Sequence, residues 1–126
     1  MNSIKNEEKT PDIAILGDQS QLTGHFHTPG TVMVQGEYRG SIECQAMIVT
    51  RKGMIDAQID AQSIEIWGVF NGFARSDKVI CRSTSKIRGF IMSYGMGIEP
   101  GAIFEGGLIF PLLGEENDET KKDRER

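Results

Sequence analysis

Apolar and polar residues alternate along most of this chain, and one alternating pattern recurs six times. In each copy a small residue lies between two mostly larger apolar ones, with one position separating neighbours. The copies are Leu22-x-Gly24-x-Phe26, Tyr38-x-Gly40-x-Ile42, Ile55-x-Ala57-x-Ile59, Phe70-x-Gly72-x-Ala74, Ile87-x-Gly89-x-Ile91 and Phe104-x-Gly106-x-Leu108. Their central residues are 16, 17, 15, 17 and 17 positions apart. The chain is therefore predicted to consist of repeats of 15 to 17 residues.

A second pattern lies between these copies and consists of two residues separated by one position. Its members are Ile13 and Ile15, Val32 and Val34, Ile48 and Thr50, Ile64 and Ile66, Val79 and Cys81, and Met96 and Ile98. Period-two alternation is typical of β-strands with one apolar face. A unit this short buries that face only by stacking on its neighbours. We therefore predict an all-β solenoid of about six turns over residues 12–110.

The small residue at the centre of each first-pattern copy has a predicted packing role. In a narrow solenoid the middle of each side faces little free space. A residue without a Cβ there would leave the axis to its larger neighbours. Ala57 indicates that one methyl group is tolerated.

Charge is concentrated at the two ends of the chain. Residues 1–11 and 111–126 hold six of the 14 basic and eight of the 18 acidic residues, and we expect both segments to be disordered. The core is left with eight basic and ten acidic residues. A nearly neutral core without a basic stripe argues against nucleic-acid binding.

The sequence also predicts a cytoplasmic protein. It contains no apolar run long enough to span a bilayer, and its N-terminus lacks the apolar region of a signal peptide. Cys44 and Cys81 form no CxxC motif and occupy apolar, strand-like segments. We interpret them as reduced, largely buried thiols.

Candidate chemistry is sparse. His25 and His27 should point outward from one strand, but the chain has no third histidine, so we expect neither a metal nor another cofactor. The alternative is a trimeric β-helix enzyme of the hexapeptide acyltransferase or carbonic anhydrase type. Those enzymes have a stricter period of 18 residues, and the anhydrases need three histidines. Trp67 is expected to lie over a corner, and the basic residues Lys78, Arg82, Lys86 and Arg88 to form a solvated edge.

The two ends of the predicted solenoid carry apolar residues where a polar cap is expected. Terminal turns without a cap expose apolar side chains and unpaired strand edges, which favour self-association. The predicted contact residues are Ile13, Ile15 and Leu22 at one end and Phe104, Leu108 and Phe110 at the other.

The repeats, the core of about 100 residues and the short charged tails together resemble the bactofilins, bacterial cytoskeletal proteins. The resemblance implies a right-handed β-helix with a triangular cross-section and a non-enzymatic scaffold. Such subunits join end to end into non-polar filaments without nucleotide and localise wall-modifying enzymes or morphogenetic proteins. Several members reach the inner face of the membrane through a short N-terminal apolar and lysine segment. Only Ile4 and Lys5 could serve here, and Glu7 and Glu8 follow them closely.

Overall fold

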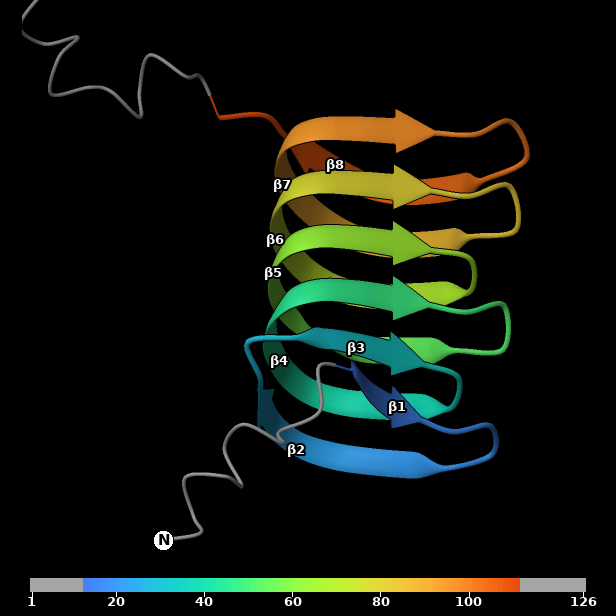
Figure 1. Ribbon diagram of the computed structural model, residues 1–126. Coiled ribbons are helices and arrows are strands. Elements are labelled where there is room, and N and C mark those ends of the chain that lie inside the picture. The colour runs from blue at the N-terminus through green and yellow to red at the C-terminus, as the bar shows by residue number, and fades with distance from the viewer. Residues whose placement is uncertain (1–12, 112–126) are drawn as a thin grey trace, which may run out of the picture.

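The computed structural model describes residues 13–111, and every regular element in this range is a β-strand (Figure 1). The strands are β1 (Ile13–Leu16), β2 (Gln21–His27), β3 (Thr31–Val34), β4 (Glu37–Val49), β5 (Met54–Ile66), β6 (Val69–Cys81), β7 (Lys86–Ile98) and β8 (Ile103–Ile109). All paired strands are parallel. Figure 1 shows the turns stacked one above another, from β1 and β2 at one end to β7 and β8 at the other. The prediction of a β-solenoid of about six turns is confirmed.

Each complete turn pairs with its neighbours along two stretches of strand. Residues 37–43 of β4 pair with β2, whereas its residues 46–49 pair with β3, so the strand bends between them. We call the first part of each turn the long side; it comprises residues 21–27, 37–43, 54–60, 69–75, 86–92 and 103–109. The second part is the short side; it comprises residues 13–16, 31–34, 46–49, 63–66, 78–81 and 95–98.

Equivalent residues of successive turns stack in register along the solenoid. One column contains Leu22, Tyr38, Ile55, Phe70, Ile87 and Phe104, and we call it the Phe70 column. A second long-side column contains Phe26, Ile42, Ile59, Ala74, Ile91 and Leu108. Both columns supply the continuous apolar core, so the first sequence pattern marked the inward positions correctly.

Small residues line the bend between the two sides, where Cys44, Ala61, Ser76 and Ser93 stack on one another. The Ser76 hydroxyl donates to the carbonyl oxygen of Lys78 at 3.0 Å and accepts from its amide at 3.3 Å. Ser93 forms the same two bonds with Gly95. These buried hydroxyls thus satisfy backbone groups that the bend would otherwise leave unpaired.

On the short side, two pairs of the second pattern do not point inward as predicted. The inward residues of this side in the first and third turns are Ala14 with Leu16 and Met47 with Val49, because these stack on Val32 and Val34. Ile13 and Ile15 therefore point outward, as do Ile48 and, beyond it, Thr50. Both faces of these two strands carry apolar residues, so alternation alone could not determine which face is inward.

The predicted packing role of the small central residues is also wrong. Gly72 has a φ of +128°, and a Cβ there would lie 2.2 Å from the carbonyl oxygen of Ala57 in the preceding turn. The glycine is needed for its backbone conformation and for the close approach of two backbones. Ala57 itself does not have a positive φ, which explains why one alanine is accepted in this column.

Candidate polymerisation interface

The N-terminal end of the solenoid is formed by β1 on the short side and β2 on the long side. Within residues 13–111, β1 pairs only with β3 and β2 only with β4, so each has one edge without a partner strand. Leu22 occupies the end of the Phe70 column and is 46% exposed, whereas its neighbour Tyr38 is 2% exposed. The inward column thus continues to the very end of the solenoid, and no other part of residues 13–111 covers it.

A small apolar cavity lies at this same end. Its volume is about 120 Å³, and it is lined by Ala14, Ile15, Leu16, Leu22, Phe26, Val32, Val34, Tyr38 and Ile42. All of these are apolar side chains apart from the hydroxyl of Tyr38, which bonds to the carbonyl oxygens of Gly24 and Ser41. The cavity could therefore accept an apolar side chain.

The C-terminal end is formed by β8 and by the last part of β7. β8 covers residues 86–92 of β7, but no strand of the described chain covers residues 95–98. Phe104 and Leu108 end the two long-side columns, and Ile98 ends a short-side column at 47% exposure. This end also presents apolar side chains and an unpaired strand edge.

The structure places the six predicted contact residues in three different positions. Leu22, Phe104 and Leu108 are the last members of inward columns. Ile13 and Ile15 belong to the end turn and point outward from β1, although Ile15 also borders the cavity. Phe110 follows β8 directly and is exposed. The structure thus brings Phe104, Leu108 and Phe110 to one end and the other three to the opposite end.

The sequence-based prediction of the contact residues did not include two groups of residues at the ends. Leu16 and Phe26 line the cavity at the N-terminal end, and Met96 and Ile98 form the uncovered part of β7. The signal for Met96 and Ile98 was available, since they are the last second-pattern pair and no further pair follows to cover them. The predicted membrane residues Ile4 and Lys5 lie outside the described residues. No helix within residues 13–111 is long and apolar enough to span a membrane.

Trp67 lies at the corner that leads from β5 to β6, as expected. Its indole nitrogen donates to Glu65 at 2.8 Å, and the guanidinium groups of Arg51 and Arg82 lie 5.6 and 5.2 Å from its ring centroid. Arg82 also bridges Glu65 at 3.0 Å and Glu99 at 2.7 Å. The hydrogen bond from Arg82 lowers the pKa of Glu99. This cluster braces the side of the solenoid and extends to Glu99, directly after β7.

The predicted basic edge does not form one surface. Arg82 belongs to the Trp67 corner, Lys78 starts the short side of β6, and Lys86 and Arg88 lie on the long side of β7. Arg88 also pairs with Glu105 at 3.2 Å.

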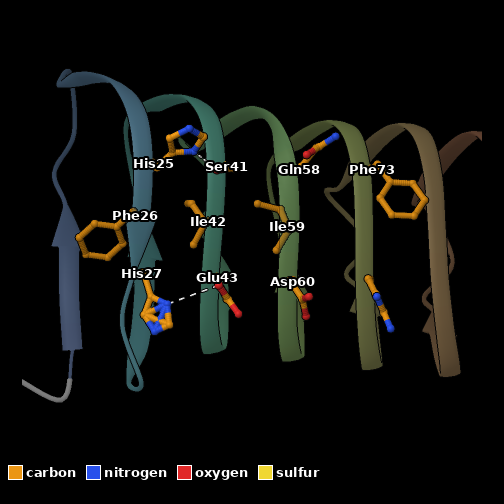
Figure 2. A pocket seen from close by; sticks show the side chains of 11 residues that line it. His25, Phe26, His27, Ser41, Ile42, Glu43, Gln58, Ile59, Asp60 and Phe73 are labelled. Carbon is orange, nitrogen blue, oxygen red and sulfur yellow. Dashed lines mark hydrogen bonds and ion pairs between the residues drawn. The ribbon is translucent and has the colours of Figure 1, made fainter.

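Figure 2 shows a shallow pocket on the long side that contains both histidines. His25 contacts the Ser41 hydroxyl through Nδ1, and Nδ1 of His27 lies 3.4 Å from Glu43. The carboxylate thus contacts a different imidazole from the one that touches serine, so these residues form no serine–histidine–acid relay. Within residues 13–111 no three His, Cys, Asp or Glu side chains lie close enough to hold a metal ion.

Both cysteines are free thiols in buried positions. Burial raises the pKa of Cys81 to about 11. Burial, together with the nearby charge of Asp60, raises the pKa of Cys44 to about 11. Both thiols are therefore protonated at neutral pH, as expected of core residues and unlike reactive cysteines.

The fold and the apolar residues at its two ends define a class of protein, the parallel β-solenoid with apolar terminal turns. The comparisons with known proteins agree with this class. A family model described as Bactofilin, polymer-forming cytoskeletal, matches residues 14–108. Because this match spans most of the chain, the protein belongs to the bactofilin family.

Two individual proteins illustrate the similarity. The chain is 27% identical to bactofilin BacO of Myxococcus xanthus (strain DK1622) over 96 residues, which cover 75% of this chain and 76% of BacO. Its fold is similar to that of the cytoskeletal bactofilin BacA determined by solid-state NMR, with a TM-score of 0.75 and 22% identity. That match covers 81% of this chain and 99% of BacA.

Proposed function

We propose that this protein polymerises end to end, without nucleotide, into filaments that act as an intracellular scaffold. The observation that carries the proposal is that inward columns of the solenoid end in apolar residues at both ends, with no strand of residues 13–111 beyond them. Stacking a second subunit on either end would bury these residues and pair the open strand edges. Apolar burial contributes roughly 25 cal/mol per Å² removed from water, and the backbone hydrogen bonds would set the register.

The family supports this proposal, because it is described as polymer-forming and cytoskeletal. By the same family resemblance, the filaments would be cytoplasmic, would catalyse no reaction and would position wall-modifying enzymes or morphogenetic proteins. Membrane contact through Ile4 and Lys5 stays a prediction.

The test is electron microscopy of the purified full-length chain in negative stain, without nucleotide. Wild-type protein should form filaments. Phe104→Arg or Phe110→Arg should retain the β-sheet circular dichroism spectrum but shorten or abolish the filaments, because each places a charge in an apolar contact. Gln62→Arg is the matched control, since it adds the same charge to an exposed position in a central turn.

Two results would contradict the proposal. Normal filaments from both end variants would show that the assigned C-terminal contact is wrong. A defined trimer containing zinc, found by sizing and metal analysis, would instead favour the β-helix enzyme alternative.

A further inference from the structure

The outer surface of the long side differs between the two halves of the solenoid. We call the outward residues of β2, β4 and β5 the acidic half; they are Gln21, Thr23, His25, His27, Glu37, Arg39, Ser41, Glu43, Met54, Asp56, Gln58 and Asp60. We call those of β6, β7 and β8 the basic half; they are Val69, Asn71, Phe73, Arg75, Lys86, Arg88, Phe90, Met92, Ile103, Glu105, Gly107 and Ile109. The acidic half has four acids and one arginine, whereas the basic half has three bases and one acid.

Several charges on the two halves form no ion pair within residues 13–111. Arg88 is neutralised by Glu105 at 3.2 Å. Among the described residues, Arg75 and Lys86 form no ion pair, and neither do Glu37 and Asp60. Asp60 and Arg75 are register partners in adjacent turns where the two halves meet, but no ion pair joins them. Each half thus carries two charges of one sign that no ion pair among the described residues neutralises.

Apolar residues show the same asymmetry. The outward residues of the basic half include Phe73, Phe90, Ile103 and Ile109, whereas Met54 is the only large aliphatic residue of the acidic half. Phe90 is 54% exposed, and its ring lies where a Cβ on Gly107 would be. Figure 2 shows Phe73 next to the polar row of His25, Ser41 and Gln58. An exposed aromatic surface ringed by charge is typical of a contact site.

We infer that the long side of one subunit docks against the long side of a second copy in reversed orientation. The acidic half of each subunit then faces the basic half of the other. A two-fold arrangement satisfies both halves at once, because the same two contacts occur twice. Burial of Phe73 and Phe90 supplies attraction, and the charges determine which half meets which.

This docking goes beyond the proposed function and needs no end contact. In filaments it would be multiplied, because the same face would recur along the filament at every subunit. A weak contact between two subunits would then become a strong contact between two filaments. We therefore expect bundles at low ionic strength that separate as salt shortens the screening length to about 3 Å near 1 M.

Charge reversal tests the pairing directly. Arg75→Glu with Lys86→Glu makes the basic half acidic, and Glu37→Lys with Asp60→Lys makes the acidic half basic. Each double variant alone should lose bundling, leaving single filaments that sediment only at high speed. An equimolar mixture of the two should recover bundles. The matched control, Lys52→Glu with Lys78→Glu, changes the charge equally away from the long side and should bundle like wild type.

Several outcomes would overturn the inference. Among them are wild-type-like bundling by either charge-reversed variant, failure of the mixture to recover, and wild-type filaments that stay single at low salt. If no filaments form, the proposal of end-to-end assembly is wrong, but the docking can still be tested on single subunits. In analytical ultracentrifugation at low salt, the wild type should dimerise and each charge-reversed variant should stay monomeric. Monomeric subunits that sediment with phosphatidylglycerol vesicles, and no longer do so when they carry Phe90→Asp, would show that this surface binds a membrane instead of a second copy.

Discussion

The Phe70 column contains large apolar residues from one end of the solenoid to the other, but its middle and its ends have different surroundings. Ile55 and Phe70 are at most 1% exposed, whereas Leu22 at the N-terminal end is 46% exposed. All of these side chains point inward from the same position of a turn. An inward apolar residue is therefore part of the core only if turns lie on both sides of it. At the ends the same residue type becomes a candidate contact surface.

The strongest test of this comparison removes the same ring from the middle and from the end of one column. Phe70→Ala should lower the free energy of unfolding by about 3–5 kcal/mol, because it leaves a cavity between two covering turns. Phe104→Ala should lower it by only about 1–2 kcal/mol, since no strand of residues 13–111 covers the C-terminal side of Phe104. Urea denaturation followed by circular dichroism measures both values. Equal losses would mean that the end of the column is as enclosed as its middle.

The glycine column offers a second test. Gly72→Ala should lower the free energy of unfolding by at least about 1–2 kcal/mol, because the methyl group meets the backbone of the preceding turn and φ is positive. Gly24 has a similar φ of +144°, but nothing lies within 4 Å of the added Cβ. Gly24→Ala should therefore destabilise the fold less.

Gly24→Ala should also weaken assembly, if a second subunit stacks on this end. A methyl group at Gly24 would project away from β4, toward that neighbour. Filament length in electron micrographs measures the effect. Unchanged filaments would indicate that the N-terminal end does not take part in the contact.

The buried thiols give the smallest expected effect and report on how well water is excluded from the middle. Burial raises the pKa of both cysteines from an ordinary value of 9.0 to about 11 in the folded chain. Between these values the unfolded chain loses thiol protons that the folded chain keeps, so the free energy of unfolding should fall as pH rises from 9 to 11. Below pH 9 this contribution should be constant.

Denaturation at a series of pH values, compared with the variant Cys44→Ala with Cys81→Ala, isolates the thiols. The free energy of unfolding of this variant should fall less steeply with pH than that of the wild type. A residual slope is expected from Tyr38, whose pKa is also raised by burial. An identical slope in both proteins would mean that the thiols are more hydrated than the structure indicates.

Much of the fold could be predicted because it depends on local repetition. The first pattern placed Tyr38, Ile55 and Phe70 in one column correctly, because the small residue at the centre of each copy marked the register even where outward residues such as Phe73 are apolar. The short side was harder to predict. Met47 and Ile48 are both apolar, so alternation allowed either one to be inward, and only the pairing with Val32 and Val34 resolved the choice. Ile13 and Ile15 were placed inward for the same reason.

The surface of the long side could not have been predicted from the spacing of its charges in the sequence. Arg75 and Lys86 are 11 positions apart, a spacing that does not match the repeat of 15 to 17 residues. Parallel stacking brings them to adjacent turns of one face, together with Phe73 and Phe90. The acidic and basic halves therefore become visible only when the outward residues of six turns are read across the strands.

By itself, the sequence determined the solenoid, its repeat length and the apolar character of its two ends, because periodic alternation allows few other ways to bury these side chains. The tertiary structure decided which residue of each short-side strand is inward, why glycine occupies its column, and which outward residues share a face. Those features depend on contacts between residues about 16 positions apart in the chain, one turn of the solenoid. Such contacts exist only after one turn has stacked on the next.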